Sequence, residues 1–140
     1  MTADIDPLLF AEVRSLISRV AYLADYGEVV EYLDNLTADA VWTVPASDSD
    51  DGIRDRAAIE AGIAHRRGEK RQGPGSHTRH VVSIVDVGTG DGGSITAVSY
   101  YTLYRRTDTE PVIVSMGRYY DELRREDGRL RIARRTARRG

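Results

Sequence analysis

The chain has 140 residues and a mass of 15.6 kDa, which suffices for one hydrophobic core but leaves too little surface to bury for two. Its formal net charge of −2 excludes the basic excess of a dedicated nucleic-acid binder, and its 41% hydrophobic residues exclude the composition of a disordered chain. The lack of cysteine excludes disulfides, thiolate nucleophiles and zinc–thiolate sites. We therefore expect a single domain over residues 1–140.

We expect no secretion signal in the first residues of the chain. Met1 to Pro7 contains acids instead of a basic segment followed by an apolar run, and no stretch of the sequence is long enough to span a bilayer. We expect a cytoplasmic protein that binds neither a membrane nor nucleic acid. Arginines are concentrated between Arg124 and Arg139, which is typical of a solvated strand face and tail but would also suit an anionic partner.

The opening segment predicts two helices. Asp6 followed by Pro7 is typical of an N-cap and the first residue of a helix, which should run to about Tyr26. Apolar residues recur along it at helical spacing: Leu9, Val13, Leu16, Ile17, Val20 and Ala24. We expect Gly27 to end this helix in the left-handed conformation. A second, shorter helix is predicted by the apolar residues Val29, Val30, Leu33 and Leu36.

The middle of the chain predicts one strand and one helix. The segment Ala40 to Val44 is short, β-branched and closed by Pro45, which favours a strand. An acidic loop is expected from Ala46 to Gly52. Asp55 is placed to cap a third helix, which passes into a polar loop from Arg66 to Gly75.

The second half of the chain predicts four strands joined by tight turns. The strand segments are rich in Val, Ile, Thr and Tyr: His77 to Val87, Ser94 to Arg105, Pro111 to Leu123 and Arg129 to Ala137. Turns containing glycine or aspartate separate them, so we expect an antiparallel meander. Helices followed by strands, in the order α-α-β-α-β-β-β-β, are typical of an α+β fold.

The first strand of this meander is apolar on both faces, with Val81 and Val85 on one and Val82 and Ile84 on the other. One face can pack against the helices. The other face then needs a cover, and we expect this cover to be the sheet of a second copy, in a homodimer.

Histidines and carboxylates are the candidate acid–base groups. His77 and His80 are three residues apart, which puts them on opposite faces of a regular strand, so at most one should face a given pocket. Of the two, His80 is the better embedded. Asp25 lies at the edge of the apolar stripe of the first helix, where a carboxylate could orient a histidine ring. Taken singly, His80 also suits a structural role and Asp25 a solvated helix end.

Tyrosine is unusually frequent, with eight tyrosines against one phenylalanine. Five of them fall in the predicted sheet: Tyr100, Tyr101, Tyr104, Tyr119 and Tyr120. A tyrosine provides an apolar wall with a polar tip, which suits a pocket for a ring-shaped molecule, although it is also simply a good strand residue. The sequence contains no phosphate-binding glycine motif, nucleophile elbow or paired-histidine metal spacing, so we expect no cofactor and no metal.

Five segments together resemble the SnoaL-like family of the nuclear-transport-factor-like superfamily, and the resemblance spans about Leu8 to Arg135. They are Tyr22-Leu-Ala-Asp25-Tyr-Gly-Glu28, Thr37-Ala-Asp-Ala-Val-Trp42, Thr78-Arg-His80-Val-Val, Gly117-Arg-Tyr-Tyr-Asp121 and Asp127-Gly128 with Arg134-Arg135. The resemblance implies a cone-shaped fold, in which a curved antiparallel sheet is wrapped by about three N-terminal helices and encloses a pocket.

The resemblance also implies site residues. The helix-borne acid of the family falls on Asp25 and its strand-borne histidine on His80; in active members these two form a dyad that removes a proton from carbon. Arg135 matches an arginine that can support a leaving anion. The residues that we place in the substrate pocket are Tyr22, Trp42, Tyr101, Tyr119 and Asp121. Dehydratase-like members often have a tyrosine one helical turn before the acid, where this chain has Ala21.

These observations favour a cofactor-independent lyase, dehydratase or isomerase acting on a small hydrophobic cyclic substrate, with His80 as general base and Asp25 holding its ring. Two alternatives stay open. The same cavity could bind a hydrophobic small molecule without chemistry, or the outer sheet face could dock onto the large subunit of a ring-hydroxylating oxygenase, as some proteins of this fold do.

Overall fold

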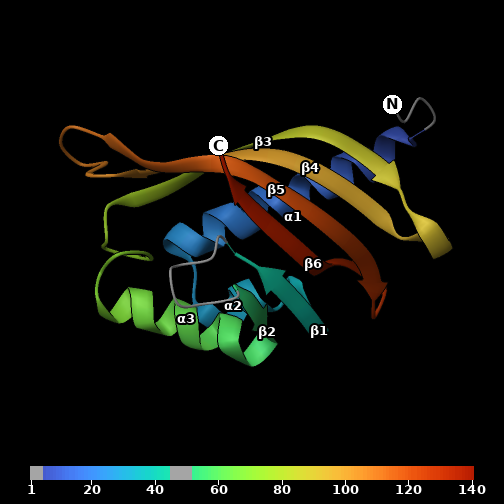
Figure 1. Cartoon of the computed structure of the whole chain (residues 1–140), viewed down its shortest axis with the longest axis horizontal. Coiled ribbons are helices and arrows are strands. Elements are labelled where there is room, and N and C mark those ends of the chain that lie inside the picture. Colours follow the sequence, from blue (N-terminus) through green and yellow to red (C-terminus); the bar gives the residue numbers. More distant parts are fainter. Residues whose placement is uncertain (1–4, 45–51) are drawn as a thin grey trace.

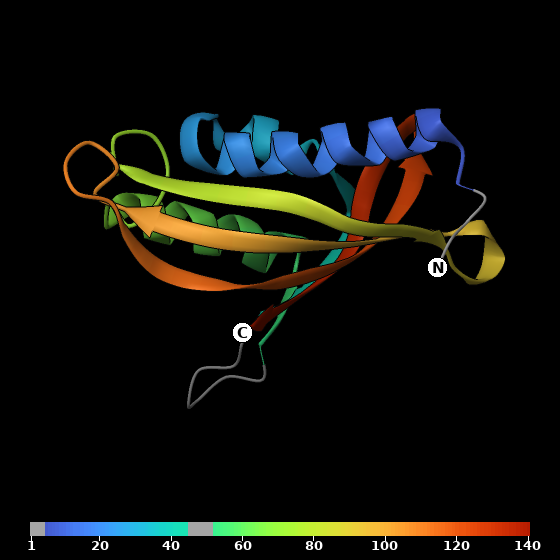
Figure 2. The ribbon, with the colours of Figure 1, turned by 90° about the horizontal axis from the view of Figure 1, so that it is seen from above.

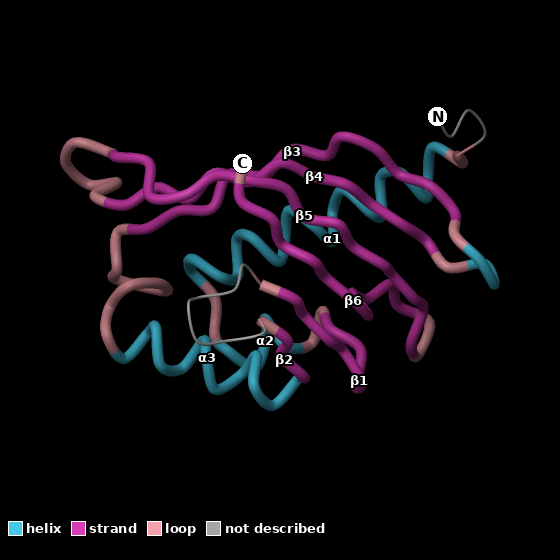
Figure 3. Tube along the Cα trace, in the orientation of Figure 1, coloured by secondary structure: helices cyan, strands magenta, loops and turns pink. Residues whose placement is uncertain are grey.

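The computed structural model describes residues 5–44 and 52–140, which form helices packed against one six-stranded sheet (Figures 1 and 3). The helices are α1 (Pro7–Tyr26), α2 (Val29–Leu33) and α3 (Arg56–Gly68), with a 3-10 turn at Asp91–Gly93. The strands are β1 (Leu36–Thr43), β2 (Ile53–Asp55), β3 (Thr78–Thr89), β4 (Ile95–Arg105), β5 (Val112–Glu126) and β6 (Arg129–Arg139). The predicted α+β class is confirmed.

The sheet is mixed, with the strand order β2-β1-β6-β5-β4-β3. Strands β3 to β6 form the predicted antiparallel meander, and β2 pairs antiparallel with β1. However, β1 runs parallel to β6, so the prediction of a wholly antiparallel sheet is wrong for this pair of strands. The reason is that β1 follows α2 in the chain, whereas β6 follows β5. No hairpin joins β1 to β6, so no tight turn imposes an antiparallel direction on this pair.

Helix α1 begins as predicted and ends differently. The Asp6 carboxylate accepts the backbone N–H of Leu8 at 3.0 Å, and Pro7 is the first helical residue. At the other end Gly27 has φ −96° and ψ 170°, which is extended backbone, so the left-handed prediction is wrong. Glycine is needed there for space, because a Cβ atom would lie 2.4 Å from Leu23 Cδ2.

The first strand is longer than predicted, because Leu36 opens β1 instead of ending the second helix. The main chain leaves the helical path at Asn35, whose carbonyl accepts the N–H of Ile132 at 2.9 Å in the first contact between β1 and β6. Strand β2 was not predicted, because three residues are too few to show an alternating apolar pattern. Pairing with β1 is what makes this segment a strand. The cap of α3 is confirmed by a 2.8 Å bond from the Ala58 N–H to Asp55. The predicted acidic loop lies, apart from Gly52, outside the described residues.

Arg67 fixes α3 against the end of α1. Its guanidinium donates to the carbonyls of Gly27 at 2.7 Å and Leu23 at 3.1 Å. A cation is favourable at this position because the carbonyls at a helix C-terminus are partly negative. The segment that follows α3 therefore lies close to the C-terminal turn of α1, while α1 itself runs along β3 (Figure 2).

The main hydrophobic core lies between the helices and the inner sheet face. Val82 and Ile84 pack against it, whereas Val81 and Val85 are each 49% exposed on the outer face. A bulge between Ile84 and Asp86 shifts the alternation, so Val87 is again buried. In this single chain the outer face is open, and its predicted cover by a second copy stays a prediction. None of the described helices is long and apolar enough to cross a membrane.

Candidate functional site

A cavity of about 760 Å³ opens between α1, the inner face of the sheet and the segment after α3. Its inner part is lined by apolar and aromatic side chains: Ile17, Val20, Ala24, Tyr32, Trp42, Val82, Tyr101, Leu103, Tyr119 and Ala137. Its outer part is lined mainly by polar and charged residues: Arg66, Lys70, Arg71, Gln72, Ser76, His77, Thr78, Arg105, Arg106, Asp108 and Arg139. A hollow with apolar walls and a few polar groups is the usual form of a small-molecule site.

Asp25 and His80 meet at this cavity. Asp25 lies in the last turn of α1 and is only 2% exposed, and His80 follows the first residues of β3. One carboxylate oxygen of Asp25 accepts the backbone N–H of His80 at 2.8 Å, and the other lies 2.8 Å from His80 Nδ1. The Asp25 carboxylate thus holds both the backbone and the ring of His80.

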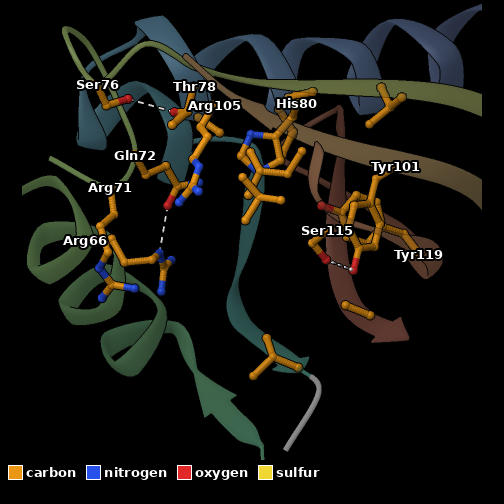
Figure 4. A pocket seen from close by; sticks show the side chains of 18 of the residues that line it. Arg66, Arg71, Gln72, Ser76, Thr78, His80, Tyr101, Arg105, Ser115 and Tyr119 are labelled. Carbon is orange, nitrogen blue, oxygen red and sulfur yellow. Dashed lines mark hydrogen bonds between the residues drawn. The ribbon is translucent and has the colours of Figure 1, made fainter. Parts of the chain in front are cut away.

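The second ring nitrogen of His80 is available to a ligand. His80 lines the cavity, its side chain is 13% exposed, and its Nε2 atom has no partner among the residues that the structure describes (Figure 4). A carboxylate can only accept hydrogen bonds, so in the neutral ring the proton between His80 and Asp25 sits on Nδ1 and Nε2 keeps a lone pair. This is the tautomer that a general base requires.

Stacked tyrosines form one wall of the cavity. The rings of Tyr101 and Tyr119 lie 4.5 Å apart with an interplanar angle of 18°, and the Tyr101 hydroxyl lies 3.4 Å from Ser115 Oγ (Figure 4). The two tyrosines are diagonal neighbours, because Tyr101 pairs with Gly117 in the ladder between β4 and β5. Burial raises the pKa of the Tyr119 phenol to about 12, so Tyr119 stays uncharged at neutral pH.

Arg135 brings a buried positive charge to the same cavity. Its guanidinium lies 3.9 Å from the ring centre of Tyr119 and 5.3 Å from that of Trp42. Asp121, on the neighbouring strand, accepts from Arg135 Nε at 2.7 Å and from Nη2 at 2.9 Å. Burial alone would lower the pKa of Arg135, but the Asp121 carboxylate outweighs this effect and holds that pKa above its ordinary value.

Two of the predicted pocket residues lie elsewhere. Asp121 is not among the residues that line the cavity; it is buried, and both its oxygens accept from Arg135. Tyr22 is 61% exposed and packs on Tyr26, 5.4 Å away, so its assignment to the pocket is wrong. The reason is the helix period, which points Tyr22 roughly opposite to the buried stripe of α1. Trp42, Tyr101, Tyr119 and Arg135 do line the cavity.

The prediction that at most one of the two histidines faces the pocket is wrong, and the charged rim was not predicted. His77 lines the cavity together with His80, because it precedes β3 in a left-handed conformation with φ 55°, where strand alternation does not apply. The sequence predicts a polar loop from Arg66 to Gly75 and a strand that ends at Arg105, and neither expectation brings their basic side chains to one cavity. Their signal was the density of arginine and lysine in the two segments, 66–71 and 105–106. Among the described residues no group of three or more histidines and carboxylates could hold a metal ion.

The model of the SnoaL-like domain matches residues 9–136. Among solved structures, ActVI-ORFA from Streptomyces coelicolor is 24% identical, with 96% of each chain covered and a TM-score of 0.77. A putative scytalone dehydratase from Novosphingobium aromaticivorans is 18% identical, covering 95% of this chain and 85% of that one at a TM-score of 0.74. No curated protein sequence matches significantly.

A third similar structure is a subunit of a larger enzyme. It is the beta subunit of a putative aromatic-ring-hydroxylating dioxygenase from Novosphingobium aromaticivorans, 16% identical over 94% of this chain and 89% of that one, with a TM-score of 0.71. At such identities the structural matches establish a shared NTF2-like, cystatin-like fold and no shared activity. The family match, by contrast, spans nearly the whole sequence. The chain belongs to the SnoaL-like domain family.

Proposed function

We propose that this protein is a cofactor-independent acid–base enzyme, a lyase, dehydratase or isomerase, that acts on a small hydrophobic cyclic substrate in the cavity. The observation that carries the proposal is the double contact of the buried Asp25 carboxylate with His80, which leaves His80 Nε2 facing a largely apolar hollow. A positioned imidazole that transfers protons accelerates a reaction roughly a hundred- to ten-thousandfold.

In the proposed reaction, His80 Nε2 removes a proton from a substrate carbon beside a carbonyl group, and the electron pair of the C–H bond moves toward the carbonyl oxygen. The imidazolium that forms is stabilised by the negative charge of Asp25, 2.8 Å from Nδ1. The same imidazolium then returns the proton to another carbon or to a leaving hydroxyl group. Return of the proton to another carbon completes an isomerisation. Its transfer to the leaving hydroxyl group releases water and completes a dehydration.

Arg135 is the group that we expect to stabilise the developing oxyanion. Two of its nitrogens are bound to Asp121, and its third, Nη1, has no partner among the described residues. A fixed guanidinium in a cavity with apolar walls stabilises negative charge more than the same group does in water. The stacked Tyr101 and Tyr119 offer a flat surface for the substrate ring.

The proposal is tested by hydrogen–deuterium exchange at the acidic carbon of cyclic ketones, beginning with 2-tetralone. Trp42 is the single tryptophan and lines the cavity, so its fluorescence selects the ketones that bind. Proton NMR in D₂O then measures exchange. We expect the protein to accelerate exchange of bound ketones on the order of a hundredfold or more, and His80→Ala and Asp25→Asn to remove most of that acceleration.

The matched control is Arg19→Gln, on the exposed face of α1 and outside the cavity, which should exchange at the native rate. Equal thermal stability of the variants shows that the fold is intact. Exchange by His80→Ala at the native rate would exclude His80 as the base.

Non-catalytic binding is the second candidate, and the size of the cavity together with its apolar inner walls favours it as much as catalysis. In that case the ketones bind, their exchange is not accelerated, and His80→Ala and Asp25→Asn bind as tightly as the native protein. The role of an oxygenase subunit is the third candidate. It is supported only by the shared fold of the dioxygenase beta subunit.

A further inference from the structure

The cavity has two chemically different ends, with His80 between them. In Figure 4, Tyr101, Tyr119 and Ser115 lie to one side of His80, whereas Arg66, Arg71, Gln72 and Arg105 lie to the other. The first group forms the flat wall already described. The second belongs to the rim formed by the end of α3, the segment after it and the end of β4.

This rim is strongly basic although the whole chain is slightly acidic. Among the residues that line the cavity, the cations are Arg66, Lys70, Arg71, Arg105, Arg106, Arg135 and Arg139, and the one acid is Asp108. Asp121 neutralises Arg135, and Glu69 neutralises Arg71. The other five cations have no carboxylate within ion-pair distance in the described part of the chain.

Some arginines elsewhere on this protein have carboxylate partners. Arg125 binds Glu12, Arg124 binds Asp39, and Arg129 binds Asp34. In the described part of the chain carboxylates thus compensate some arginines, whereas five cations are gathered at one cavity without such compensation. Cations gathered in a cleft without counterions raise the local concentration of an anionic ligand.

Arg66 is the cation that gains most from an anion. It is half-buried, and its Nε donates to Gln72 Oε1 at 2.7 Å, while its two terminal nitrogens have no described partner. Burial lowers the pKa of Arg66, and repulsion from Arg71 and Arg54 lowers it further. These effects outweigh that of Tyr32, which raises this pKa. Gly62, one turn earlier, leaves room for the guanidinium, since a Cβ atom there would lie 3.1 Å from Arg66 Nη1.

The backbone of the rim is held in an unfavourable conformation. Four non-glycine residues of the described chain have positive φ, and three of them line the cavity: Lys70 with 57°, His77 with 55° and Arg106 with 57°. Such residues each cost roughly 1 kcal/mol or more, and they gather at ligand sites more often than elsewhere. The N–H of Thr107 donates to the carbonyl of His77 at 3.1 Å, which ties the two rim segments together.

We propose that the ligand of this cavity is a cyclic carboxylic acid, whose carboxylate binds at the rim to Arg66 and Arg105 while its ring lies against Tyr101 and Tyr119 beside His80. A guanidinium offers two parallel N–H donors that match the two oxygens of a carboxylate. Gln72 contributes its amide N–H, because its oxygen is already bound to Arg66. This inference names the substrate class of the proposed enzyme and rests on the same cavity.

The test compares two probes that differ only in charge, 2-naphthoate and its neutral amide, 2-naphthamide. Binding is measured by Trp42 fluorescence and by calorimetry. The native protein should bind 2-naphthoate at least tenfold more tightly than the amide, as expected for one charged hydrogen-bonded contact. In Arg66→Gln combined with Arg105→Gln this preference should fall to within about twofold, with affinity for 2-naphthamide unchanged. Unchanged amide binding shows that the cavity is intact.

The matched control is again Arg19→Gln, which removes the same charge from an exposed site outside the cavity and should keep the preference. His80→Ala should keep it too, although it abolishes exchange of the ketones. Loss of the preference in His80→Ala but not in the double variant would place the carboxylate at the dyad and overturn the proposal. Equal affinities for the two probes in the native protein, or no binding of 2-naphthoate, would also overturn it. A preference without any ketone exchange would leave the ligand class standing and reject the enzyme.

Discussion

At the scale of single residues, Asp25 and Asp121 show two uses of a buried carboxylate. Asp25 accepts the backbone N–H and faces the ring of one residue, His80, whose other nitrogen stays free. Asp121 gives both oxygens to Arg135 and thereby holds a buried cation at the cavity. The first arrangement leaves a reactive atom open to a ligand, while the second compensates a charge that burial would otherwise make costly.

Removing Asp121 should therefore destabilise the protein strongly. In Asp121→Ala the buried Arg135 loses its partner, and the expected loss is about 3–5 kcal/mol of unfolding free energy. Denaturant unfolding measures it. The control Asp39→Ala breaks the exposed pair with Arg124, where the side chain of Asp39 is 70% exposed, and should change stability far less. Similar losses in both variants would contradict a special role of the buried pair.

Tyr119 predicts how stability depends on alkaline pH. Its pKa in the folded protein is raised by burial to about 12, above its value in the unfolded chain of about 10. The unfolded state then loses its proton first, so the stabilisation is complete below about pH 10 and is lost as pH rises toward about 12. Tyr119→Phe should reduce the fall in melting temperature over this range. An unchanged fall would mean that other groups, such as the buried Tyr32, dominate it.

At the scale of elements, close backbone contact explains a glycine in the sheet. Gly117 lies in β5 opposite Arg139 of β6 and opposite Tyr101 of β4. A Cβ atom there would lie 2.0 Å from the carbonyl oxygen of Arg138. Only glycine allows β5 and β6 to approach in this way beside the tyrosine wall.

Gly117→Ala should accordingly cost about 2 kcal/mol or more, because backbone atoms cannot move aside as a flexible side chain can. The control is Gly68→Ala at the end of α3, where a Cβ atom meets nothing within 4 Å and where alanine is the better helix former. Thermal unfolding of both variants tests this. Equal stability of Gly117→Ala and the native protein would contradict the predicted collision.

At the scale of the whole molecule, the outer sheet face remains uncovered in the single chain. Its exposed apolar residues include Val81, Tyr100, Met116 and Tyr120, with exposed fractions of 49%, 54%, 53% and 38%. Large apolar patches of this kind mark interaction surfaces. The homodimer predicted from the sequence would bury this patch, and it stays a prediction.

Light scattering coupled to gel filtration should show a dimer at micromolar concentration, and Met116→Glu should shift it toward monomer, because a charge in an apolar interface loses its hydration. Tyr22→Glu serves as control, since Tyr22 is 61% exposed on α1, away from this face. A native protein that is monomeric throughout would reject the dimer.

The sequence by itself determined the features that depend on neighbours along the chain. The caps at Asp6 and Asp55, the apolar stripe of α1 and the four strands of the meander follow from local hydrogen bonding and from periods of 3.6 and 2 residues. The pairing of Asp25 with His80 was expected through a family resemblance, not from any local pattern.

Only the tertiary structure decided what depends on contacts between distant segments. The parallel pairing of β1 with β6 and the existence of β2 arise when separate elements pack together. The same holds for the basic rim, where α3, the segment after it and the end of β4 bring cations together that lie up to 39 residues apart, from Arg66 to Arg105. The physical reason is that side-chain direction and charge pairing are set by packing, whereas local propensity sets only which elements form.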